Sequence, residues 1–105
     1  MPAPTNHNSM NIRQATEDDL PSILNLYAQP SIDNGEKLSL EQAKALFVVM
    51  ATYPDYKLYL AEINDRPVGT FALLIMHNLG HMGAPSGLVE SVAVTPDQHG
   101  QGIGK

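Results

Sequence analysis

The chain has 105 residues, and its 11 acidic and 6 basic side chains give a formal net charge of −5. This length is typical of one domain, and 43% hydrophobic and 16% charged residues are typical of a globular chain rather than a disordered one. The acidic balance argues against a nucleic-acid partner, the apolar runs are too short for a membrane span, and the lack of cysteine excludes disulfides and thiolate metal sites.

The first nine residues, from Met1 to Ser9, contain two prolines among mostly polar side chains. They have neither the basic n-region nor the apolar h-region of a secretory signal. We therefore expect a flexible N-terminal tail over residues 1–9, one domain over residues 10–105, and a cytoplasmic location.

A short strand over residues 10–15 and a first helix are expected next. The segment from Thr16 to Pro21 has the capping and acidic residues of a helix N-terminus, and a proline costs little in the first turn. This favours a helix that begins near Asp19. The helix is expected to end near Tyr27. Its apolar face comprises Leu20, Ile23, Leu24 and Tyr27.

A second helix is expected after a loop over residues 30–37. Ser39 and Gln42 have the spacing of a capping box at its start, and Pro54 ends it. Its apolar face comprises Ala43, Leu46, Phe47 and Met50.

The second half of the domain reads as three strands, over residues 56–63, 68–76 and 88–95. The short turn over residues 64–67 favours an antiparallel hairpin. A long loop over residues 77–87 follows, in which Met82 is expected to pack. The order strand, helix, helix, strand, strand, strand predicts an α+β fold with a mainly antiparallel sheet and two helices.

Two histidines in the long loop have a spacing that metal ligands use on a helix. His77 and His81 are four residues apart, but Gly80 and Gly83 disfavour a helix there. Because no third ligand is evident either, we expect no metal site.

Glycines at positions 100, 102 and 104 follow the last strand. Backbone N–H groups of glycines, which no side chain covers, can surround a phosphate, so one interpretation of this segment is an anion cradle. The alternative interpretation is a flexible tail. A Walker loop does not fit, because His99 occupies the place of its first glycine. A dinucleotide-binding fingerprint does not fit, because Lys105 occupies the place of its last one.

The segment from Glu90 to Pro96, together with the loop from His99 to Gly104, resembles motif A of the GNAT superfamily of N-acetyltransferases. The family's loop reads Arg/Gln-x-x-Gly-x-Gly/Ala, so Gly102 and Gly104 match and His99 departs from it. Residues 12–21 resemble the family's first strand and helix start. In the family more helices and strands follow motif A, so the resemblance implies a partial GNAT fold, the N-terminal two thirds of an acetyltransferase domain.

The resemblance implies an N-acetyltransferase that transfers acetyl from acetyl-CoA to a small-molecule primary amine by direct attack. It implies Glu90 as the general base, although an exposed strand glutamate or a partner of Arg66 is the alternative for this residue. It implies the backbone N–H of Val92 as the donor that stabilises the oxyanion. The residues implied in binding acetyl-CoA are Val92, Ala93, Val94, His99, Gly100, Gln101, Gly102, Ile103 and Gly104.

Two functional hypotheses follow from these observations. The first is an active amine N-acetyltransferase, whose acceptor stays open among polyamines, amino sugars, aminoglycosides, amino acids and protein N-termini. The second is a truncated, non-catalytic domain that binds CoA weakly or self-associates. We expect self-association because an open strand edge and an apolar sheet face invite pairing with another chain.

Overall fold

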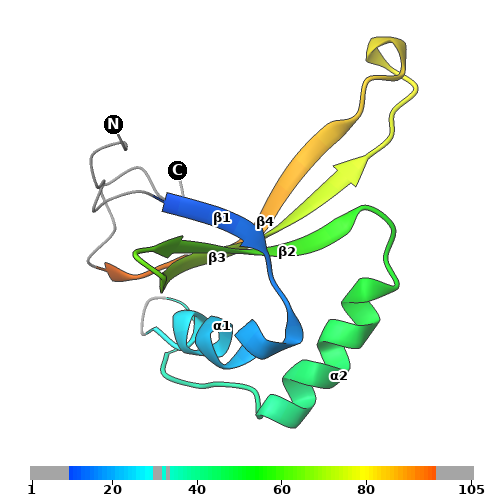
Figure 1. Ribbon diagram of the computed structural model, residues 1–105. Helices are drawn as coiled ribbons and strands as arrows, with labels where there is room; N and C mark the ends of the chain where they lie inside the picture. Colours follow the sequence, from blue (N-terminus) through cyan, green and yellow to red (C-terminus); the bar gives the residue numbers. More distant parts are fainter. Residues whose placement is uncertain (1–9, 30–31, 33, 97–105) are drawn as a thin grey trace, which may run out of the picture.

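The computed structural model describes residues 10–29, 32 and 34–96 (Figure 1). The expected tail over residues 1–9 and the glycine-rich loop lie outside the described residues. The helices are α1 (Leu20–Tyr27) and α2 (Leu40–Ala51), and short 3₁₀ turns cover Glu17–Asp19 and His81–Gly83. The strands are β1 (Met10–Gln14), β2 (Tyr56–Ile63), β3 (Arg66–Met76) and β4 (Ser86–Val94).

These strands form one antiparallel sheet in the order β1-β2-β3-β4. Both helices lie on the same face of the sheet (Figure 1). The structure therefore confirms the α+β class, the order of the elements and the antiparallel pairing that the sequence predicts.

The β2–β3 hairpin differs from the prediction, because its turn is shorter. Asn64 and Asp65 have φ angles of 52° and 64°, the left-handed pair that a two-residue hairpin turn requires. Arg66 then pairs with Ile63, so β3 begins two residues earlier than predicted. The expected four-residue turn is therefore wrong, because Asn64 and Asp65 alone suffice to reverse the chain.

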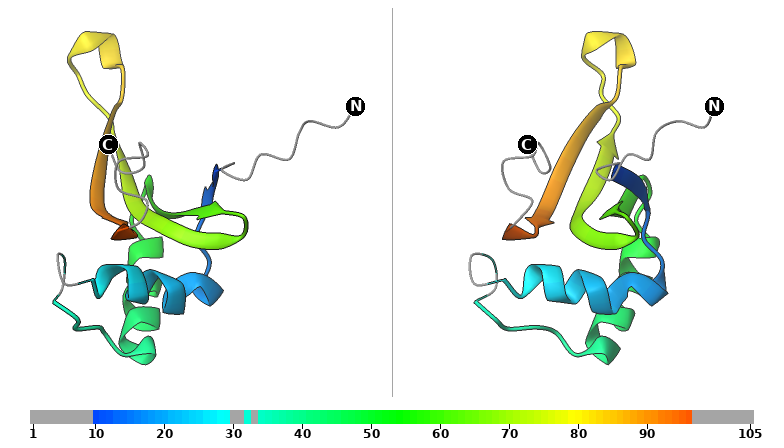
Figure 2. Two further views of the ribbon diagram at one scale, coloured as in Figure 1. Left: turned by 90° about the vertical axis from the view of Figure 1, so that its left-hand side faces the viewer. Right: turned by 60° about the vertical axis from the view of Figure 1, so that its left-hand side comes forward.

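The loop between β3 and β4 extends away from the body of the protein (Figure 2). Met82 and Leu79 near its tip are fully exposed. The prediction that Met82 packs is therefore wrong, because this hairpin projects beyond the reach of either helix.

The ends of α2 follow the predicted chemistry closely. The Ser39 hydroxyl accepts a hydrogen bond from the backbone N–H of Gln42, and the Gln42 side chain accepts one from the backbone N–H of Ser39. The helix ends at Ala51, before Pro54. On the predicted apolar face Ala43 is buried, whereas Leu46 is 50% exposed.

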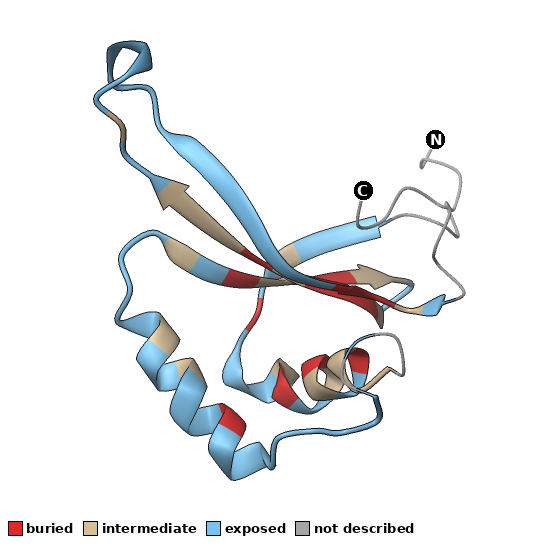
Figure 3. Ribbon diagram, turned by 180° about the vertical axis from the view of Figure 1, so that it is seen from behind, coloured by how far each residue is buried: buried red, intermediate tan, exposed pale blue. Residues whose placement is uncertain are grey.

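The core lies between α1 and the centre of the sheet, where Figure 3 shows the buried residues. Ile23 and Leu26 of α1 pack in one cluster with Leu58, Leu60 and Ala72 of β2 and β3. Since side chains alternate along a strand, these strands also carry a second apolar row on the other face. There the rings of Tyr59 and Phe71 stack with centroids 5.3 Å apart.

An ion-pair network fixes the start of α1 to the sheet. Arg13 of β1 donates two hydrogen bonds to the Asp19 carboxylate, at 2.7 and 2.8 Å, and two to the Glu62 carboxylate of β2, at 3.0 and 3.4 Å. Asp19 also accepts the backbone N–H of Thr16 at 2.7 Å. The Arg13 guanidinium, with a smaller contribution from Thr16, lowers the pKa of the Asp19 carboxyl from 3.8 to about 2.

The Arg13–Asp19 contact is expected to make the stability of the fold fall in acid. Because the pKa of Asp19 is depressed in the folded chain, the contact contributes fully above about pH 4 and is lost as the pH falls toward about 2. Asp19→Asn should lower the melting temperature at pH 7 and flatten its decline between pH 4 and pH 2. Asp18→Asn, at an exposed position in the same turn, is the matched control. Equal declines in the two variants would contradict this expectation.

Candidate functional site

The last strand contains a β-bulge near its middle. Ala93 pairs with Thr70 and Glu90 pairs with Ala72, so Ser91 and Val92 together lie opposite one β3 residue. Ser91 has a φ angle of 53°, in the left-handed region. A bulge of this kind bends the strand and leaves one peptide unit outside the regular ladder. The β3–β4 ladder is therefore interrupted next to Glu90.

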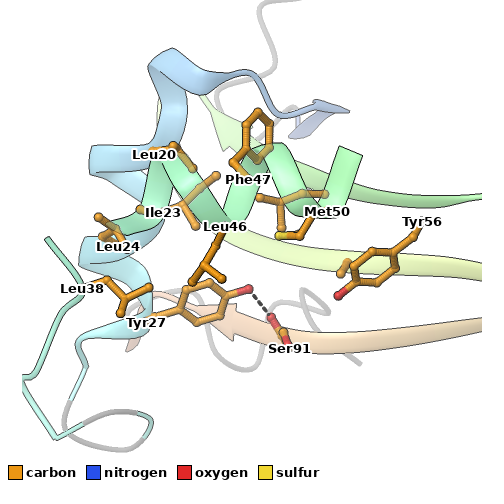
Figure 4. A pocket seen from close by; sticks show the side chains of 13 residues that line it. Leu20, Ile23, Leu24, Tyr27, Leu38, Leu46, Phe47, Met50, Tyr56 and Ser91 are labelled. Atoms are coloured by element: carbon orange, nitrogen blue, oxygen red, sulfur yellow. Dashed lines mark hydrogen bonds between the residues drawn. The ribbon is translucent and has the colours of Figure 1, made fainter. Parts of the chain in front are cut away.

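Tyr27, the last residue of α1, contacts this bulge directly. Its hydroxyl donates a 2.7 Å hydrogen bond to the backbone carbonyl oxygen of Ser91 (Figure 4). The helical pattern places Tyr27 on the inward face of α1, but nothing local in the sequence indicates a partner 64 residues away. Tyr27 is thus a candidate site residue that the sequence alone does not identify.

Because Ser91 has a left-handed conformation, the free energy of unfolding should depend strongly on the residue type at this position. A β-branched side chain at this φ is strained, whereas glycine adopts it freely. We expect Ser91→Val to lower the free energy of unfolding by about 1–2 kcal/mol and Ser91→Gly to change it little. Chemical denaturation of both variants checks this expectation. A valine variant as stable as the glycine variant would show that the bulge is absent.

Glu90 is exposed and precedes the bulge. Directly paired residues of an antiparallel sheet share a face, so Glu90 lies on the same face as Ala72, which is the face that the helices cover. The predicted base therefore lies on β4, an outer strand of the described sheet, and on the face that the helices cover.

A cavity of about 200 Å³ opens between α1, α2 and this face of the sheet (Figure 4). We call it the α1–α2 cavity. Apolar side chains dominate its lining, and hydroxyl groups supply the polar part. The lining residues are Leu20, Ile23, Leu24, Tyr27, Leu38, Ala43, Leu46, Phe47, Met50, Tyr56, Leu58, Ala72 and Ser91.

The predicted backbone residues of the cosubstrate site begin within the bulge, at Val92, and continue along β4. Val92 is exposed, whereas Ala93 and Val94 are buried and pair with Thr70 and Gly69. The predicted loop residues, His99 to Gly104, lie outside the described residues. The structure therefore brings Glu90 and Val92–Val94 together on one strand and leaves the phosphate cradle a prediction.

A second hollow, of about 290 Å³, lies where α1 meets the end of β4. It differs from the α1–α2 cavity because polar side chains contribute much of its lining. Two buried oxygens in lining residues, Oε1 of Gln29 and Oγ1 of Thr95, have no hydrogen-bond partner among the described residues. The end of β4 therefore borders a hollow in which two buried oxygens lack a partner among the described residues.

His77 lies near a carboxylate of the chain. Its Nε2 atom lies 3.4 Å from Oδ2 of Asp55, and residues 10–29, 32 and 34–96 contain no cluster of three His, Asp or Glu suited to a metal ion. Neither helix in this part of the chain has the length and hydropathy of a membrane span.

Comparison with known proteins defines the class of this fold. Residues 20–105 match the sequence profile of the acetyltransferase (GNAT) family. The chain therefore belongs to the GNAT family of acetyltransferases, which confirms the predicted resemblance. A search of curated proteins returns no significant match.

Solved structures share the fold. A protein from Agrobacterium tumefaciens described as an acetyltransferase is 33% identical, with a TM-score of 0.74 over 90% of this chain. The chain covers 65% of that protein's length. A glucosamine-6-phosphate N-acetyltransferase from Arabidopsis thaliana, 18% identical, has a TM-score of 0.69 over 89% of this chain and 65% of its own length. At that identity the likeness concerns the fold alone.

Proposed function

We propose that the protein transfers an acetyl group from acetyl-CoA to a primary amine at the bulge of β4. The observation that carries this proposal is the interruption of the β3–β4 ladder at Ser91 and Val92, directly after Glu90. It lies within the segment that matches the GNAT family. Peptide groups outside a regular ladder can serve a ligand instead of a neighbouring strand.

Acetyl-CoA supplies an activated acetyl group as a thioester. Transfer forms a bond between the amine nitrogen and the acetyl carbon, breaks the bond from that carbon to sulfur, and releases the thiol of CoA. Amines are protonated at neutral pH, so a base must first remove a proton from the ammonium group. The Glu90 carboxylate takes that proton, and its exposed position lets it pass the proton to water.

The bulge also supplies a donor for the thioester oxygen. Negative charge grows on this oxygen during the attack, and a fixed backbone N–H stabilises it without reorganisation. We assign this role to the N–H of Val92, an exposed residue of the bulge. The backbone of Val92 to Val94 would hold the pantetheine arm, and the loop from His99 to Gly104 would hold the diphosphate.

The structure fits this arrangement at both ends of the site. The apolar α1–α2 cavity opens on the Ser91 side of the bulge, whereas the second hollow, which Thr95 lines, lies at the end of β4. The unpaired Oγ1 of Thr95 could donate to an oxygen of the cosubstrate, since a hydroxyl is both donor and acceptor.

A turnover assay with a mixed amine panel tests the proposal directly. The protein is incubated with acetyl-CoA and each amine, and release of the CoA thiol is followed together with the mass of the acetylated product. Thiol release that depends on one amine class supports an enzyme. Saturable acetyl-CoA binding without turnover on any amine would favour the non-catalytic alternative.

Self-association is the second part of the proposal. β1 and β4 are the outer strands of the described sheet. The face opposite the helices exposes apolar side chains, among them Ile12 at 50% and Val89 at 53%. An unpaired edge beside such a face favours pairing with a second copy. Sedimentation equilibrium of the 105-residue chain should therefore give a mass above 11.4 kDa, and a monomer at all concentrations would contradict this.

A further inference from the structure

We infer that the accepted amine carries an aromatic or branched apolar group that occupies the α1–α2 cavity. This inference rests on the proposed function and specifies its substrate class. Its basis is the chemistry of the cavity, its size and its position relative to Glu90.

The lining of the cavity selects an apolar ligand. None of its thirteen residues is charged, and the polar members are Tyr27, Tyr56 and Ser91. The Tyr27 hydroxyl already donates to the Ser91 carbonyl. A sugar or a second ammonium group placed here would lose its hydration without gaining equivalent hydrogen bonds, which is unfavourable. The cavity therefore disfavours polyamines and amino sugars.

The size of the cavity suits one ring or a branched alkyl group. Its volume is about 200 Å³. An apolar protein cavity of about 150 Å³ is large enough to hold benzene. A phenyl group thus fits with space for a short linker, and a fused ring system is close to the upper limit.

The position of the cavity brings such an amine to the base. Ala72 and Ser91 form part of the wall, and Glu90 is both the cross-strand partner of Ala72 and the residue before Ser91. A ligand whose ring lies among the leucines can therefore extend a short linker toward the Glu90 carboxylate. The negative carboxylate complements the ammonium group, and the net charge of −5 favours its approach.

The mouth of the cavity has the exposed apolar residues expected of a ligand entrance. Leu46 of α2 points toward Tyr27 in Figure 4, yet it is 50% exposed, and Leu38 nearby is 44% exposed. A bound ring would cover part of both side chains. Burial of this apolar surface is the expected source of affinity.

Direct binding without acetyl-CoA tests the inference. The 105-residue chain is titrated by calorimetry with 2-phenylethylamine, and with putrescine, glucosamine and 2-phenylethanol as comparison ligands. We expect saturable binding of 2-phenylethylamine, weaker binding of the neutral alcohol, and none of the two polar amines. The alcohol retains the ring but lacks the charge that Glu90 recognises.

Two substitutions on one helix locate the ligand. Leu46→Trp fills the cavity from its mouth and should weaken 2-phenylethylamine binding by about tenfold or more. Val48→Trp adds the same side chain at a position that is 63% exposed and outside the lining, so it should leave binding unchanged. Circular dichroism of both variants verifies that the fold is retained.

The outcomes separate this inference from the proposed function. If acetyl-CoA binds but putrescine or glucosamine binds better than 2-phenylethylamine, the substrate class is overturned and the acetyltransferase stands. Binding that Leu46→Trp and Val48→Trp affect equally would also overturn it, because the ligand would lie elsewhere. If 2-phenylethylamine binds as expected and acetyl-CoA does not, the proposed function fails, and with it the assignment of this cavity to the acceptor.

Discussion

Replacing Glu90 by glutamine is expected to lower kcat for acetyl transfer by about 10²- to 10⁴-fold, the usual contribution of a positioned general base. Glutamine retains the size and polarity of the side chain, so the bulge and the cavity should be preserved. It cannot accept the proton from the ammonium group. The loss should therefore appear in kcat, with little change in the affinity for acetyl-CoA.

The pH dependence of turnover in Glu90→Gln tests the role of Glu90 as the general base more strictly than the rate at a single pH. In Glu90→Gln no carboxylate removes the proton from the ammonium group, so only amine that is already uncharged can react. A more alkaline buffer raises the uncharged fraction of the amine and should therefore partly restore the rate of this variant. Glu41→Gln, at an exposed position in the first turn of α2, is the matched control and should behave like the original protein. An unchanged kcat in Glu90→Gln across the pH range would show that Glu90 is not the base.

Replacing Leu60 by alanine is expected to destabilise the fold by about 2–5 kcal/mol. Leu60 is 1% exposed and lies in the middle of β2, between Arg13 and Thr70 of the neighbouring strands. Its removal leaves a void beneath α1 that the strands on both sides cannot fill without breaking their register. Since a small domain has a free energy of unfolding of only about 5–15 kcal/mol, this loss is a large fraction of the total.

Urea denaturation measures this loss against the same substitution at a fully exposed leucine. Leu79 is fully exposed near the tip of the β3–β4 hairpin, so Leu79→Ala should change the free energy of unfolding by less than about 0.5 kcal/mol. Because both substitutions replace leucine by alanine, a difference between their effects on the free energy of unfolding reports the difference in burial. Equal effects of Leu60→Ala and Leu79→Ala would contradict the position of the core.

Local sequence signals were sufficient for most of the framework. The capping residues Ser39 and Gln42, and the acidic turn that ends at Asp19, mark the helix starts because their side chains bond backbone groups only three residues away. The hairpin between β2 and β3 is also predictable from local signals, because a short turn separates two strand-like segments. Its exact turn was not predicted, because the left-handed conformations of Asn64 and Asp65 let Arg66 join the strand.

The candidate site is less predictable because it depends on contacts across the chain. Glu90 could be selected from the resemblance of its segment to motif A. The bulge after it arises from the register of β4 against β3, which no pattern within β4 reveals. The hydrogen bond from Tyr27 to Ser91 and the α1–α2 cavity likewise result from the packing of α1 and α2 on the sheet.

The most direct test of the central claim is a calorimetric titration of the 105-residue chain with acetyl-CoA. If the bulge of β4 and the residues after it form a cosubstrate site, binding should saturate at one equivalent per chain. It should also be weakened in Ser91→Val, which disturbs the bulge, and retained in Ser91→Gly. The absence of saturable binding, or equal binding by the two variants, would contradict the assignment of β4 as the acetyl-CoA site.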